Sequence, residues 1–271
     1  MVAMPRRWNV FRRIQRKHAR IIGNALVVVA VVIALKAAAH ALGWEALSLN
    51  PLLSGIVAAD VFLMGFLLSG VLADFKESEK LPGEVAASLE ILFDEATSMA
   101  RRANDATSTS AAAAVTAGVR DLATSLHNWF YKKQRTSELM NALGDLSPRL
   151  LALESPAQAA SIARIKQEQH ALRRALVRIH TIRETSFISS GYLIAELTTG
   201  LLSLALILSK IEPFYESLFI VGVIVFLLAF LLLLIGDLDN PFGYYEKHSS
   251  EEVSLKPLED AIARMNATPE K

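Results

Sequence analysis

Long apolar runs separated by polar stretches dominate the pattern along this chain. Four runs are long enough for a helix to cross the hydrocarbon core of a bilayer, which takes about 17–25 residues. They cover Ile21–Leu42, Pro51–Ala73, Phe187–Ser209 and Ser217–Gly236. The pattern predicts an all-α integral membrane protein with four transmembrane helices in two hairpins.

The polar segment between the second and third spans, residues 74–186, is rich in Ala, Leu, Glu and Arg, which favour helices. Helix-breaking residues divide it into about three predicted helices. The breakers are Pro82-Gly83, Gly118, Gly144, Pro148 and Pro156. In the last helix an apolar stripe recurs at helical spacing from Ile162 to Ile182. No Pro or Gly interrupts Ala157 to Ser190, so this helix could run directly into the third span.

Basic residues near the span ends predict the orientation. Residues 1–20 contain seven Lys and Arg and no acid, whereas the two short connections contain only Lys210. The positive-inside rule therefore places both termini and the 74–186 region in the cytoplasm, with the spans in the cell (inner) membrane. The predicted segments are a basic N-terminus (1–20), a hairpin (21–73), a cytoplasmic helical region (74–186), a second hairpin (187–236) and a cytoplasmic tail (237–271).

The N-terminus has alternative interpretations. Trp8, Phe11 and Ile14 recur at helical spacing between arginines, which favours an amphipathic helix on the membrane surface. A solvated basic tail that only sets the topology is the alternative. Residues 1–41 also have the pattern of a signal peptide, with Ala39-His40-Ala41 as its cleavage site, and cleavage would leave three spans.

Composition excludes several classes of function. Hydrophobic residues make up 52% of the chain, and a formal charge of +1 does not suit a nucleic-acid-binding protein. The absence of cysteine rules out thiolate nucleophiles and cysteine-ligated metals. Motifs of nucleotide-binding loops, zinc proteases and serine hydrolases are missing, so we expect no enzyme activity, cofactor or metal. The basic, aromatic stretch Leu126–Arg135 could hold an anionic ligand, but such a cluster is far more often an amphipathic helix that packs its rings and exposes its lysines.

Charged residues inside the spans are candidates for function, because each costs about 2.5–3.5 kcal/mol to insert at the bilayer centre. Lys36 and Asp60 are expected about 9 and 13 Å below the same membrane face, so they could form an ion pair. Alternatively, Asp60 could line a water-filled path. Glu196 could face an aqueous vestibule, or be protonated and bonded to a neighbouring helix.

The second span is the best candidate for lining a pore. Phe62 and Phe66 are four residues apart and share one helix face, which suits a hydrophobic constriction. Ala58, one turn earlier, is too small to extend it. Packed or lipid-facing rings are the alternative. Because four helices enclose little space, a path for ions would need several copies of the chain.

After the fourth span the chain reads Gly236-Asp-Leu-Asp-Asn-Pro-Phe-Gly243. This stretch resembles the one that follows the last span of bestrophin and bestrophin-like membrane proteins. The second span and its exit, from Val61 to Lys80, are similar to the same region of bacterial members. The layout of hairpins, helical insert and cytoplasmic termini is similar too, and it is closest to the divergent bestrophin-like branch.

This resemblance implies a homo-oligomer, a pentamer in the proper bestrophins, that conducts anions such as chloride through a neck at Phe62 and Phe66. It also implies a motif at the cytoplasmic mouth. The motif residues are Asp237, Asp239, Asn240, Pro241, Phe242 and Gly243. An ordinary helix-stop turn explains Asp239-Asn-Pro as well. The acidic run of calcium-gated members is replaced by Tyr244-Tyr-Glu-Lys-His248, so no calcium site is expected.

Three functions are compatible with these features. The leading hypothesis is an oligomeric anion channel in the lipid bilayer. The second is a non-conducting scaffold or signalling protein that binds a cytoplasmic partner through residues 157–186. The third is a proton-coupled transporter that uses Asp60 and Glu196, for which inverted repeats and broken helices would be expected and are not found.

Overall fold

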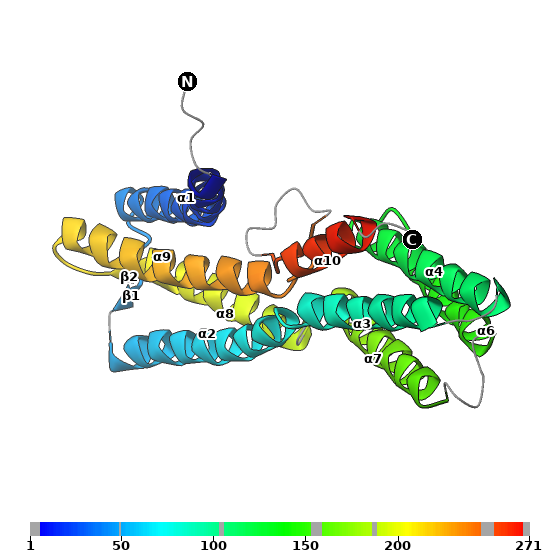
Figure 1. The fold of residues 1–271 in the computed structure, drawn as a ribbon. Helices are drawn as coiled ribbons and strands as arrows, with labels where there is room; N and C mark the ends of the chain where they lie inside the picture. Colours follow the sequence, from blue (N-terminus) through cyan, green and yellow to red (C-terminus); the bar gives the residue numbers. More distant parts are fainter. Residues whose placement is uncertain are drawn as a thin grey trace, which may run out of the picture. The chain divides into compact units, whose positions relative to one another are not determined.

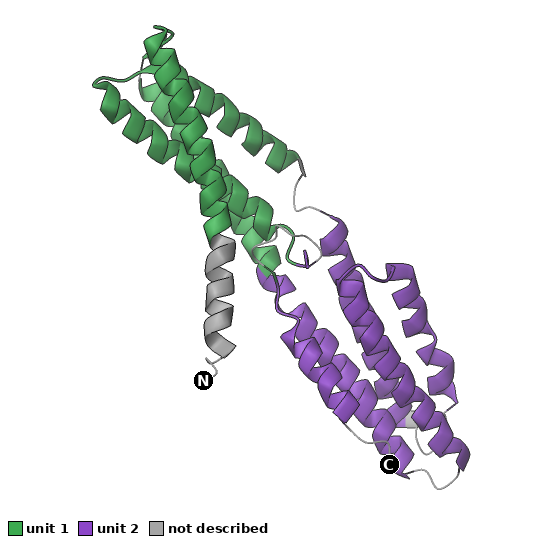
Figure 2. Cartoon of the chain, turned by 90° about the horizontal axis from the view of Figure 1, so that it is seen from above, with its two compact units in different colours: residues 1–75, 186–241, 248–252 green, residues 76–185, 242–247, 253–271 purple. Residues whose placement is uncertain are grey.

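A computed structural model describes residues 6–48, 50–102, 106–152, 159–185, 189–244 and 252–267. For residues 6–18, 159 and 189 only the backbone is described. The chain forms two compact units (Figure 2). Unit 1 comprises Met1–Phe75, Ser186–Pro241 and His248–Glu252, and unit 2 comprises Lys76–Thr185, Phe242–Lys247 and Val253–Lys271. The predicted amphipathic pattern of Trp8, Phe11 and Ile14 lies outside the described side chains.

Unit 1 contains the four predicted spans, and each is a helix (Figure 1). Its elements are α1 (Arg6–Ala41), β1 (Leu47–Ser48), α2 (Pro51–Ser78, whose last turn belongs to unit 2), α8 (Ser189–Leu208), β2 (Ser209–Lys210) and α9 (Phe214–Leu238). In the described chain, four helical stretches are long and apolar enough to cross a membrane: Ala19–Ala41, Ser190–Leu208, Phe214–Leu238 and a stretch that begins at Pro51. The all-α membrane architecture predicted from the apolar runs is confirmed.

The two short connections between paired spans lie at the same end of unit 1. Strands β1 and β2 pair in parallel, with Leu47 opposite Ser209 and Ser48 opposite Lys210. We call residues 42–48 and 209–213 the loop end of unit 1. Both hairpins therefore turn on one side, as a four-span topology with both termini on the other side requires.

Most of the described residues of unit 2 are helical. Its helices are α3 (Leu81–Arg102), α4 (Ala106–Phe130), α5 (Thr136–Gly144), α6 (Leu146–Leu151), α7 (Ala159–Glu184) and α10 (Lys256–Ala267). Helix α3 packs against α4 and α7, and α10, from the C-terminal tail, packs on α3 and α4. The sequence did not reveal that the tail is part of this helical unit.

The predicted continuous helix from residue 157 into the third span is wrong. Helix α7 ends at Glu184, and α8 begins at Ser189. Near this end the Thr185 hydroxyl donates to the Thr181 carbonyl at 2.6 Å. A run without Pro or Gly allows a helix to continue but does not require it.

The apolar stripe of α7 is buried inside unit 2. Ile165, Leu172 and Ile179 are completely buried, and α7 packs on α3. A stripe that fills the core of its own unit is not available to another protein. The hypothesis of a scaffold that binds a partner through residues 157–186 therefore loses the observation that motivated it.

The sequence suggested that Gly118 breaks a helix, and this prediction is wrong. Gly118 lies inside α4, at a point where α6 comes close. A Cβ at this position would lie 2.8 Å from Leu146 Cδ2 and 2.5 Å from Arg149 Nη1. Leu146 is buried, so it has little room to move. The missing side chain at Gly118 allows the two helices to pack.

Substituting Gly118 tests this close contact. Alanine raises helix propensity at any helical glycine, so Gly83→Ala, with nothing within 4 Å of the new Cβ, serves as a matched control. We expect Gly118→Ala to be less stable than Gly83→Ala by about 1–3 kcal/mol, the usual cost of overpacking. Thermal unfolding midpoints of the two purified variants give the comparison, and equal midpoints would contradict it.

Candidate functional site

One strip of the exposed surface of α2 consists of small residues and two aromatic rings, and the exposed aliphatic side chains of Leu52, Ile56 and Leu72 lie outside this strip. Phe62 and Phe66 are 77% and 63% exposed in unit 1. Exposed small residues flank them on the same side of the helix. These residues are Gly55, Ala58, Ala59, Gly65 and Ser69. At 3.6 residues per turn they form one strip with the two rings, which we call the α2 face.

The exposed sides of the other three spans also include small residues, such as Ala30 and Ala34 on α1 and Gly200 on α8, but their described residues form no strip of small residues around two exposed phenylalanine rings like that of α2. Large apolar side chains are exposed there too, including Leu26, Val27 and Val31 on α1, Leu193, Leu197 and Leu201 on α8, and Phe219, Val223 and Leu227 on α9. Large apolar side chains suit lipid tails, whereas small residues in a span let another helix come close. Within the described part of unit 1, the α2 face is thus a surface suited to close contact with another helix.

Asp60 points away from the α2 face. Its side chain is buried, with 4% exposure, and its two oxygens accept hydrogen bonds from Thr198 Oγ1 at 2.6 Å and Thr199 Oγ1 at 3.3 Å on α8. Two residues along a helix correspond to a rotation of about 200°, so Asp60 and Phe62 lie on nearly opposite sides of α2. Asp60 is therefore not a candidate for the same lining as the two rings.

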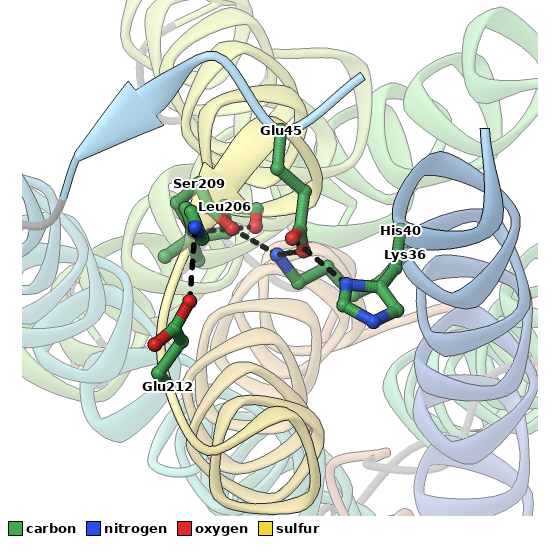
Figure 3. Close-up of polar contacts among 7 residues, drawn as sticks. Lys36, His40, Glu45, Leu206, Ser209 and Glu212 are labelled. Carbon is green, nitrogen blue, oxygen red and sulfur yellow. Dashed lines mark hydrogen bonds and ion pairs between the residues drawn. The ribbon is translucent and has the colours of Figure 1, made fainter. Parts of the chain in front are cut away.

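The predicted ion pair between Lys36 and Asp60 is wrong, because Lys36 has other partners. Its side chain is fully buried, and its Nζ donates to Glu45 Oε1 at 2.8 Å and to the Ser209 backbone carbonyl. The other Glu45 oxygen lies 2.8 Å from His40 Nδ1. Figure 3 shows Lys36 and His40 converging on Glu45 at the loop end. We call Lys36, His40, Glu45 and Ser209 the loop-end cluster.

The turn after α1 explains how Glu45 reaches Lys36. Gly43 has a φ of +68°, the left-handed conformation that glycine adopts at helix ends. The Trp44 N–H donates to the Ala39 carbonyl at 2.9 Å, which folds the chain back over the last turn of α1. Sequence reasoning missed Glu45, although an acid nine residues after a lysine that lies in a span was a usable signal.

Glu196 lies on the exposed side of α8. Its carboxylate has no hydrogen bond or ion pair with any residue that the structure describes, and its neighbours Thr198 and Thr199 bond to Asp60 instead. The predicted alternative of a bond to a neighbouring helix is thus not formed within the described part of unit 1. The vestibule position stays a prediction.

The motif after the fourth span is divided between the two units. Helix α9 ends at Leu238, and the Asp239 N–H caps it by donating to the Ile235 carbonyl at 3.1 Å. The helix therefore stops just before Asn240-Pro241, as the helix-stop interpretation predicted. Phe242 is fully buried in unit 2, with ring centroids 6.0 Å from Phe130 and 6.5 Å from Tyr244. A role of Asp237–Gly243 at a channel mouth is not tested by this geometry.

Solved structures share this fold. A bacterial bestrophin homologue from Klebsiella pneumoniae, carrying a single mutation, matches with a TM-score of 0.71 and 16% identity over 91% of this chain and 98% of its own. Another variant of a bestrophin homologue from this organism gives 0.67 and 17% over 91% and 97%. A variant described as a membrane protein gives 0.69 and 16% over 89% and 96%. No protein-family model and no curated protein matches the sequence. The chain therefore has a bestrophin-like fold, in agreement with the resemblance seen in the sequence.

Proposed function

We propose that this protein is an oligomeric channel for anions such as chloride, in which α2 of every copy lines the conduction path. The α2 face is the observation that carries the proposal. It combines small residues, which suit close helix packing, with two apolar rings, which suit a hydrophobic constriction. The bestrophin-like fold supports it, and the resemblance in the sequence implies five copies around the path.

The single charge within the span of α2 does not oppose an anion path. Asp60 is the only charged residue between Pro51 and Ala73, and it is bound by two threonines of α8. A ring of acids along a path would favour cations. Because the acid is turned away from Phe62 and Phe66, this objection to an anion path does not apply.

The arrangement of the connections also supports a proposed orientation. Both connections between spans lie at the loop end, and seven basic residues precede the first span. The positive-inside rule then puts the loop end on the outer side of the membrane and both termini in the cytoplasm. In this orientation the loop-end cluster belongs to the outer part of the protein.

Current across a planar bilayer tests the proposal directly. The purified protein is reconstituted under a steep chloride gradient, with a nearly impermeant cation present. We expect currents that reverse near the chloride equilibrium potential, carried by particles that contain several copies of the chain. A strictly monomeric protein in mild detergent, or folded and inserted protein that passes no current, would contradict the proposal.

Substituting Asp60 tests whether this carboxylate only stabilises the fold or also lines the conduction path. Asp60→Ala removes the acceptor of two threonine hydroxyls in a buried position, so we expect a loss of about 1–3 kcal/mol in stability. The reversal potential should stay unchanged, because the carboxylate faces α8 and not the ions. Thermal unfolding midpoints of the wild type and the variant measure the change in stability, and their reversal potentials measure any change in ion selectivity. A shift toward or away from chloride selectivity would place Asp60 in the path after all.

A further inference from the structure

A polar pocket in unit 2 gathers basic side chains where α4 ends, α5 begins and α7 ends. Its volume is about 490 Å³, and its charged lining residues are Lys132, Lys133, Arg135, Arg183, Glu138 and Glu184. Four basic residues thus face two acidic ones. We propose that this pocket, here named the basic pocket, binds an anionic ligand that carries a phosphate group.

Lys132 has a backbone conformation that favours glycine. Its φ is +53°, in the left-handed region where a side chain is strained. The position closes the end of α4: the Lys132 N–H donates to the Trp129 carbonyl at 3.0 Å, and the Lys133 N–H donates to the Asn128 carbonyl at 2.9 Å. Glycine is the usual residue for such a helix end. Compared with glycine, lysine at this position strains the backbone but adds a positive charge to the pocket.

Arg183 is held in place by a buried ring. Its guanidinium lies 4.7 Å from the centroid of the Trp129 ring, and Nη1 donates to the Trp129 carbonyl at 3.2 Å. Trp129 itself is buried and donates from Nε1 to Thr136 Oγ1 at 2.9 Å. A guanidinium stacked on an aromatic ring is oriented in advance, and its planar fork of donors matches the oxygens of a phosphate.

The start of α5 adds to the positive potential of the pocket. Arg135 precedes the first residue of this helix, Thr136, and both line the pocket. Helix N-termini attract phosphate because their N–H groups and the helix dipole point toward the ligand. One of the two acids, Glu138, accepts a hydrogen bond from the Arg135 N–H at 3.3 Å, so its carboxylate is engaged in capping the helix.

The volume suits more than a bare ion. Sites for small molecules typically measure about 300–1,000 Å³, and the basic pocket falls within this range. The phosphate could belong to a soluble molecule or to the headgroup of an anionic lipid. Arg183 precedes Ser190, the first residue of the apolar stretch of α8, by seven positions, so a lipid source belongs in the test.

Thermal unfolding of the full-length protein in mild detergent tests the proposal. Pyrophosphate and dioctanoyl phosphatidic acid are titrated separately at constant ionic strength, with sulfate as the reference anion. We expect at least one of them to raise the unfolding midpoint beyond the effect of sulfate. In Lys132→Gly the affinity for that ligand should fall about tenfold, through loss of a charge-assisted contact. The midpoint without ligand should equal or exceed that of the wild type, because glycine relieves the strain.

Lys80→Gly is the matched control, since Lys80 is an exposed lysine in the turn before α3 and does not line the pocket. It should bind the ligand as tightly as the wild type. Stabilisation by pyrophosphate alone supports a soluble ligand, and stabilisation by phosphatidic acid alone supports a lipid. The proposal is overturned if neither exceeds sulfate, or if Lys132→Gly binds as tightly as the wild type.

Discussion

Replacing Glu45 by alanine should destabilise the protein by about 3–5 kcal/mol, the cost of leaving a buried charge without its partner. Lys36 is fully buried, and Glu45 is the carboxylate that binds it, with only 9% of its side chain exposed. In the variant the ammonium would keep the Ser209 carbonyl as its acceptor but lose its counter-charge. The thermal unfolding midpoint of purified Glu45→Ala, compared with that of the wild type, measures the effect.

Two further variants show whether the effect comes from the buried charge. Glu212→Ala removes another carboxylate at the loop end, one that is 75% exposed and pairs with Lys210, so its midpoint should barely change. The double variant Lys36→Met/Glu45→Ala removes both charges and should recover most of the lost stability. A double variant as unstable as Glu45→Ala would mean that lost packing, and not an unpaired charge, causes the effect.

The same ion pair predicts how stability depends on pH. Hydrogen bonds from Lys36 and His40 hold the pKa of Glu45 below its ordinary value of 4.5. A lowered pKa contributes stability that is fully present above pH 4.5 and is lost as the pH falls through the pKa in the folded state. The midpoint of the wild type should therefore approach that of Glu45→Ala in acid.

Replacing Phe62 by alanine should raise the single-channel current roughly threefold to tenfold, which corresponds to a barrier lowered by about 0.7–1.4 kcal/mol. The physical reason is that an apolar ring in a narrow path disfavours water and hydrated ions. Phe66→Ala, one turn along the α2 face, should act in the same direction. Single-channel recordings in planar bilayers measure both variants against the wild type.

Phe219→Ala is the matched control for this prediction. Phe219 lies on α9 and is 73% exposed, close to the 77% of Phe62, but it belongs to a side covered by large apolar residues. Contact with lipid on that side predicts an unchanged current. If Phe62→Ala and Phe219→Ala behave alike, the two rings of α2 also face lipid, and the proposed constriction is wrong.

The positions of the spans could be predicted almost completely from the sequence. Each predicted span coincides with a helix over most of its length, and the ends of α1, α8 and α9 differ from the predicted ones by a few residues. This success has a local cause, since a long apolar run must cross the membrane as a helix wherever its neighbours lie. The resemblance at Asn240–Gly243 identified the fold for a related reason. A short sequence motif can be recognised without knowing which residues it contacts in the folded protein.

The candidate site could be predicted only in part. Helical rise gave Lys36 and Asp60 similar depths, but depth does not specify direction around the helix axis. The tertiary structure turns Asp60 toward Thr198 on α8 and Lys36 toward Glu45. The position of Phe62 and Phe66 on one face of the helix followed from their spacing, yet their exposure depended on how α2 packs.

By itself, then, the sequence determined which segments are apolar spans, that the region between the second and third spans is mainly helical, and which residue types are available for chemistry. These properties depend on local hydrophobicity and helix propensity. Only the tertiary structure decided that the stripe of α7 is core, that Gly118 admits α6, and that four basic residues surround one pocket. Each of these depends on which helix faces meet, and the free energy of such packing comes from residues far apart in the chain.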